Sequence, residues 1–88
     1  MTNNTRRKIR LALGLVEQAL HNNSKKYVYK HVGNAINEVH RLVADSEGYL
    51  RCLSGRLQES FDKLDLGLFE EIKVELSYDN DFCDIVRI

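Results

Sequence analysis

The sequence predicts a small α+β domain in which three amphipathic helices precede a C-terminal β-hairpin. Apolar residues recur at steps of three and four over the first two thirds of the chain, which is the period of an α-helix. After Gly67 the pattern changes to alternation, which is typical of half-buried strands. The expected elements are helices at about 5–22, 25–44 and 47–64, and strands at about 71–78 and 82–88. A chain of 88 residues has the length of one small domain, 1–88.

The first two predicted helices each carry a continuous apolar stripe. In 5–22 the stripe consists of Ile9, Leu13, Val16 and Leu20, widened by Ala12, Leu15 and Ala19. In 25–44 it consists of Val28, Val32, Ala35, Ile36, Val39 and Val43. Four valines lower the helix propensity of the second segment, so we expect its stability to come from packing.

The third predicted helix, 47–64, has the clearest repeat of the three. Its apolar residues are Leu50, Leu53, Leu57, Phe61 and Leu64. Gly55 lies within this repeat and costs about 1 kcal/mol relative to alanine. The glycine fits either a close helix crossing or a break in the helix after Ser54, and the sequence leaves both open.

The C-terminal segment fits a hairpin. Apolar residues alternate with polar ones at Ile72, Val74, Leu76 and Tyr78. The following Asp79-Asn80-Asp81 is typical of a turn, so we predict that Asn80 is the tip of the hairpin. An isolated hairpin is only marginally stable in water, and an open strand edge can pair with another chain. We therefore expect the hairpin to pack on the helices or to form the seam of a homodimer.

The same segment also fits a helix. Leu68, Phe69, Ile72 and Leu76 would then share one helical face. The β-branched residues and the turn that follows favour the two strands over this alternative.

Composition narrows the class of protein. The apolar stretch Leu11–Val16 is far shorter than the roughly 20 residues of a transmembrane helix, and no signal cleavage site follows it. The two cysteines, Cys52 and Cys83, match neither a disulfide framework nor a CxxC motif. We expect a cytoplasmic protein with reduced thiols and no membrane contact.

Charge is divided sharply along the chain, although the formal net charge is zero. Residues 1–44 hold eight basic and two acidic residues, a net charge of +6, and residues 45–88 carry a net charge of −6. In one interpretation, the two halves offset one another within the fold. Alternatively, the acidic half meets a basic partner protein, or the basic half contacts nucleic acid.

No motif for catalysis or metal binding is present in the sequence. His21, His31 and His40 are nine or ten residues apart, which is not a ligand spacing. The sequence from Asp79 begins like a calcium loop but has Asp84 where that loop requires glycine. There is no nucleophile elbow and no phosphate-binding loop. Cys52 and His40 could meet in space, although helix packing explains Cys52 better.

We therefore expect a non-enzymatic binding or regulatory protein of the adaptor, inhibitor or immunity type. It would use no catalytic residue, cofactor, metal or small-molecule substrate, and it would self-associate. The residues expected to contact a protein partner are Glu70, Glu71, Glu75, Asp79, Asp81 and Asp84. The alternative is a nucleic-acid-binding regulator. Its contacts would be Arg6, Arg7, Lys8, Arg10, Lys25, Lys26, Tyr29 and Lys30.

Overall fold

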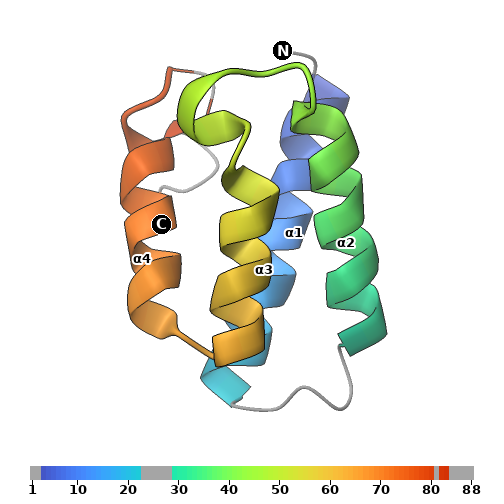
Figure 1. Cartoon of the computed structure of the whole chain (residues 1–88), viewed down its shortest axis with the longest axis vertical. Helices are drawn as coiled ribbons and strands as arrows, with labels where there is room; N and C mark the ends of the chain where they lie inside the picture. Colours follow the sequence, from blue (N-terminus) through green and yellow to red (C-terminus); the bar gives the residue numbers. More distant parts are fainter. Residues whose placement is uncertain (1–2, 23–28, 81, 84–88) are drawn as a thin grey trace.

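The chain folds into an antiparallel bundle of four α-helices. This computed structural model describes residues 3–22, 29–80 and 82–83. The α-helices are α1 (Asn3–Asn22), α2 (Tyr29–Val43), α3 (Leu53–Lys63) and α4 (Leu66–Ser77), and a short 3₁₀ helix, η1 (Gly48–Leu50), precedes α3. Successive α-helices run in opposite directions, and α1 lies behind α3, with α2 and α4 on either side (Figure 1).

The first two helices match the sequence pattern closely. The predicted helix at 5–22 is α1, and the predicted helix at 25–44 is α2 from Tyr29 onward, with 25–28 outside the described residues. Within those bounds, the main apolar positions of both stripes are buried, except that Leu15 and Ala35 are only half-buried.

The single helix predicted at 47–64 is wrong, because the structure divides it in two. The 3₁₀ helix η1 is followed by a turn at Arg51 and Cys52, and α3 begins at Leu53. Gly48 starts η1 with φ 66°, a conformation that glycine adopts without strain. Gly55 explains neither a crossing nor a break, since a Cβ atom added there would have no neighbour within 4 Å.

The predicted β-hairpin is also wrong, and with it the α+β class. No strand occurs among residues 3–22, 29–80 and 82–83, and most of the segment 71–78 belongs to α4. Phe82 lies in a turn and Cys83 has a helical conformation. Residues 84–88 fall outside the described residues. The hairpin edge therefore cannot serve as the seam of a dimer.

The helical alternative prevails because it buries the larger side chains. Phe69, Ile72 and Leu76 are each at most 1% exposed, whereas Val74 is 53% and Tyr78 83% exposed. A strand would have placed Ile72, Val74 and Leu76 on one face and left unpaired backbone groups along its edges. A helix satisfies those groups within itself.

The start of α4 is fixed by a cap. Asp65 has extended backbone dihedrals, and its Oδ1 accepts a hydrogen bond from the Leu68 N–H at 3.0 Å. The residue before it, Leu64, ends α3 in the left-handed conformation with φ 51°. Together these two residues reverse the chain between α3 and α4.

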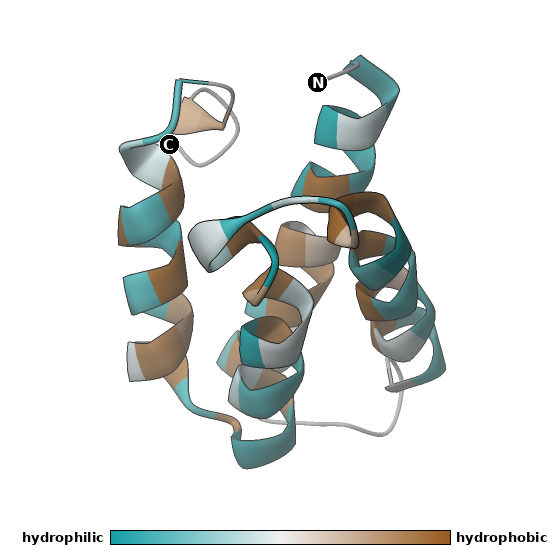
Figure 2. Cartoon of the chain, turned by 45° about the horizontal axis from the view of Figure 1, so that its top comes forward, coloured by the Kyte–Doolittle hydropathy of each residue, from teal (hydrophilic) through white to brown (hydrophobic). Residues whose placement is uncertain are grey.

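A single apolar core fills the space between the helices. Figure 2 shows that the hydrophobic positions of α4 gather on the side that faces the rest of the bundle. The largest fully buried side chains are Phe61, Phe69, Phe82, Ile9, Leu53, Leu57, Ile72 and Leu76. Every α-helix contributes to this core, so none of them is an appendage.

Replacing Asp65 by alanine is expected to lower the free energy of unfolding by about 1 kcal/mol, because the Leu68 amide loses its acceptor. Urea denaturation followed by far-UV circular dichroism measures the change. Asp65→Ser retains a side-chain acceptor and should recover most of the loss. Equal stability of the alanine variant and the wild type would contradict the role of this cap.

Candidate interaction surface

The acidic residues expected to meet a partner have different environments in the structure. Glu75 forms an ion pair with Arg56 of α3, and Asp79 accepts a hydrogen bond from the Tyr49 hydroxyl at 2.5 Å. Glu70 and Glu71 are exposed on α4. The remaining two, Asp81 and Asp84, lie outside the described residues.

Glu70 and Glu71 share their side of α4 with two exposed hydrophobic residues, Val74 and Tyr78. Spacings of three and four residues place them on the same side of the helix. We call these four residues the α4 face. It combines negative charge with uncovered apolar area.

The basic residues expected to contact nucleic acid are likewise divided. Lys8 pairs with Glu38 of α2 at 2.9 Å, and Arg6 is half-buried. Arg7 and Arg10 are exposed on α1, and Lys30 is exposed at the start of α2. Lys25 and Lys26, and the side chain of Tyr29, lie outside the described part of the chain.

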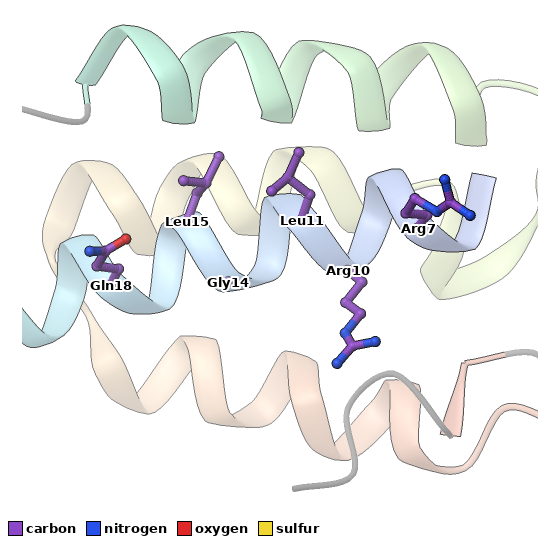
Figure 3. Close-up of a pocket in the computed structure, with 6 residues that line it drawn as sticks. All are labelled: Arg7, Arg10, Leu11, Gly14, Leu15 and Gln18. Atoms are coloured by element: carbon purple, nitrogen blue, oxygen red, sulfur yellow. The ribbon is translucent and has the colours of Figure 1, made fainter. Parts of the chain in front are cut away.

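Arg7 and Arg10 border a hollow in the surface that sequence analysis did not predict. This hollow follows the outer side of α1, and a second one, in the gap between α1 and α2, shares Leu11 and Leu15 with it. Figure 3 shows Leu11 and Leu15 pointing from α1 toward α2, while Arg10 points to the opposite side. We call the two hollows together the α1–α2 groove. Its lining residues are Arg7, Lys8, Arg10, Leu11, Gly14, Leu15 and Gln18 of α1, and His31, Asn34, Ala35 and Glu38 of α2.

The floor of this groove is apolar and its outer margin is basic. Leu11 is 60% exposed, while Leu15 and Ala35 are half-buried and pack against the core. Within the described residues, neither Arg7 nor Arg10 has a carboxylate partner. An exposed leucine one turn from Arg7, a guanidinium group with no carboxylate partner among the described residues, suits a ligand that is both apolar and anionic.

Gly14 keeps the groove open. It lies in the interior of α1, where glycine is about 1 kcal/mol less favourable than alanine. Packing within the chain does not explain it, because a Cβ atom added at Gly14 would find no neighbour within 4 Å. Gly33 of α2 likewise has no neighbour within 4 Å of such an atom, so close helix packing explains neither glycine. The exposed backbone at Gly14 allows a partner to approach α1 closely.

An ion-pair cluster joins α1 and α2 at one end of the groove. Glu38 accepts hydrogen bonds from Arg41, one turn further along α2, and from Lys8 of α1. These two cations lower the pKa of Glu38 to about 2. The carboxylate is thus ionised at neutral pH and holds Lys8 in place beside Leu11.

The ion pairs among the described residues do not neutralise the two charged halves of the chain. Glu38 pairs with Lys8 and Arg41 within the basic half, and Arg56 pairs with Glu75 within the acidic half. The ion pair Lys73–Glu17 does join the halves, at 3.2 Å. It uses an acid from the basic half and a base from the acidic half, so it leaves the excess charge of each half unbalanced.

No cluster of metal-ligating side chains is assembled among the described residues. No three His, Cys, Asp or Glu side chains there are placed to hold a metal ion. His40 lies next to Ser54 rather than Cys52, with 3.2 Å between Nδ1 and Oγ. Ser54 is only 5% exposed, so this contact joins α2 to the buried side of α3.

Comparison with known proteins gives no relative from which a function could be transferred. No protein-family model matches the chain, and no curated protein or solved structure is similar enough to match it. None of the described helices has the length and hydropathy needed to cross a bilayer. The function must be inferred from the surface itself.

The sequence contained one signal for the groove. Leu11 lies outside the apolar stripe of α1, so a helix that buries Ile9 and Leu13 must expose Leu11 to some degree. An exposed leucine is common in proteins and says little alone. Its neighbours from α2, such as Ala35, become visible only when the two helices are packed together.

Replacing Glu38 by glutamine is expected to lower the melting temperature in a pH-dependent way. The pKa of Glu38 is lowered in the folded state, so its contribution is complete above pH 4.5 and disappears as the pH falls to about 2. Thermal unfolding of the variant and the wild type at several pH values measures this difference. Glu70→Gln, which removes an exposed carboxylate with no partner among the described residues, is the control. A deficit that persists unchanged at the lowest pH would contradict the ion-pair explanation.

Proposed function

We propose that this domain is a non-enzymatic binding protein and that its α1–α2 groove receives an acidic amphipathic helix of a partner protein. One observation carries the proposal. Leu11, 60% exposed, lies one turn after the exposed Arg7 on a groove floor that Leu15 and Ala35 extend.

A groove between two antiparallel helices is suited to a third helix. Apolar side chains at steps of three and four would enter between Leu11, Leu15 and Ala35. Carboxylates on the flank of the same helix would reach Arg7 and Arg10, which increases both the association rate and the specificity. The apolar contacts would supply most of the affinity.

The acidic half of the chain gives weaker support for the same class of function. Two of its expected contacts, Glu75 and Asp79, already bind Arg56 and Tyr49 within the fold. The α4 face retains Glu70 and Glu71 for a basic partner. A basic protein bound at the α4 face is therefore the second candidate partner within the protein-binding proposal.

A nucleic-acid function is supported less well by the described residues. Phosphate binding relies on several cations that follow one backbone. Arg7 lies near the start of α1 and Lys30 near the start of α2, at opposite ends of the bundle (Figure 1). Between them the surface presents Leu11 and Leu15, which suit side chains better than phosphates.

A labelled synthetic peptide tests the proposal. The probe is a helical peptide with leucines at steps of three and four and glutamates on its flanks. Its counterpart has every glutamate replaced by lysine. We expect the acidic peptide to shift the amide resonances of Arg7, Leu11 and Leu15, and the basic peptide to bind about tenfold more weakly or not at all.

Leu11→Asp should weaken binding of the acidic peptide about tenfold or more, because it removes the apolar anchor and adds a repelling charge. Val74→Asp is the matched control, since it places the same charge on α4 outside the groove. Equal binding of both peptides, or resonance shifts confined to other surfaces, would contradict the proposal. Salt-sensitive binding of duplex DNA that Arg7→Glu abolishes would favour the nucleic-acid alternative instead.

Gly14→Ala separates stability from binding. The substitution is expected to raise the free energy of unfolding by about 1 kcal/mol, since alanine favours the helix and its methyl group meets nothing. The same methyl group should lower the affinity for the acidic peptide, because it occupies the groove. Gly33→Ala in α2 also has room for a methyl group but lies outside the groove lining. It should stabilise the fold and leave peptide affinity unchanged. Unaltered affinity in the Gly14 variant would show that the partner does not approach α1 there.

A further inference from the structure

We propose that the acidic helix bound by the α1–α2 groove is α4 of a second copy of this chain. This inference rests on the proposed function and identifies its partner. The juxtaposition to be explained is that one chain exposes an apolar patch beside exposed cations on α1 and another beside exposed anions on α4.

The α4 face has the chemistry that the groove requires. Val74 and Tyr78 are 53% and 83% exposed, so they offer apolar area that the bundle does not cover. Glu70, on the turn before Val74, is exposed and has no partner among the described residues. Glu71 lies beside it, with 3.9 Å between its Oε2 and Nη2 of Arg56.

The two surfaces also match in spacing. On α1, Arg7, Leu11 and Leu15 follow one another at steps of four residues. On α4, Glu70, Val74 and Tyr78 do the same. A step of four advances both helices by about 6 Å.

A parallel alignment of α1 from one copy with α4 from another therefore brings complementary groups together. Arg7 lies opposite Glu70, and Leu11 lies opposite Val74. The Tyr78 ring then reaches Leu15 and the open backbone at Gly14. This pairing explains why α1 tolerates an unfavourable glycine on its exposed side.

The division of charge favours a second copy over an unrelated protein. Each chain carries an excess of bases in its first half and an equal excess of acids in its second. The internal ion pair Lys73–Glu17 leaves both excesses in place. A copy of the chain thus carries, in its second half, an acidic excess as large as the basic excess of the first half.

Charge reversal on the two surfaces tests this inference. Sedimentation velocity of the wild type, at concentrations up to about 1 mM, should show association. Arg7→Glu alone and Glu70→Arg alone should each weaken it about tenfold or more. An equimolar mixture of the two variants should associate again, since the reversed groups restore an opposite-charge contact. Lys30→Glu, an exposed charge outside both surfaces, should change little.

Recovery in the mixture excludes misfolding as the cause of the loss in the single variants. Disulfide trapping gives a second measurement in a chain that carries Cys52→Ser and Cys83→Ser. A mixture of the Leu11→Cys and Val74→Cys variants should form a mixed disulfide between copies on oxidation.

The two proposals fail in different ways. A wild type that stays monomeric, while the acidic peptide still binds and Leu11→Asp abolishes that binding, overturns the second copy but leaves the proposed function intact. Self-association that neither charge reversal weakens also overturns this inference. If the acidic peptide does not bind the groove, the proposed function fails, and a monomeric wild type then removes the inference as well.

Discussion

Burial of Phe69, Ile72 and Leu76 is the constraint on which the rest of the structure depends. These side chains share one face only if residues 66–77 are helical, and all three are almost completely buried. In a chain of 88 residues the core is small, so leaving Phe69 out of it, as a strand that buries Ile72 and Leu76 would do, would remove a large part of it. The α4 face follows from this burial, because a helix that buries Phe69, Ile72 and Leu76 must direct Val74 and Tyr78 toward solvent.

The first two helices could be predicted from the sequence, whereas the C-terminal element could not. In α1 and α2 the apolar residues fit only a helical period. In α4 they fit both periods, since Ile72 and Leu76 belong equally to an alternating and to a helical pattern. The difference lies in Phe69 and Val74. A strand would have buried Val74 and a helix buries Phe69, and only the assembled core decides which contact is worth more.

The interaction surface was predictable only in part. Charge counting located the two poles of the chain, and Arg7, Arg10, Glu70 and Glu71 do lie exposed. It did not show that Lys8, Glu75 and Asp79 are engaged within the fold, because their partners are distant in sequence. Nor could it reveal the groove, whose floor combines residues of α1 and α2. Contacts between residues of different helices depend on how the helices pack, and a single sequence does not specify that packing.

The Lys73–Glu17 ion pair affects how the molecule behaves in an electric field before it contacts a partner. By pairing the minority charge of each half, it leaves a neutral protein with a permanent electric dipole across the bundle. Near a charged surface such a molecule experiences a torque that turns its oppositely charged half toward the surface. The field decays over about one Debye length, roughly 8 Å at physiological ionic strength, which is shorter than the bundle, so the near half is attracted more strongly than the far half is repelled. A neutral chain of this kind is therefore both oriented and weakly attracted, and both effects shrink as salt is added.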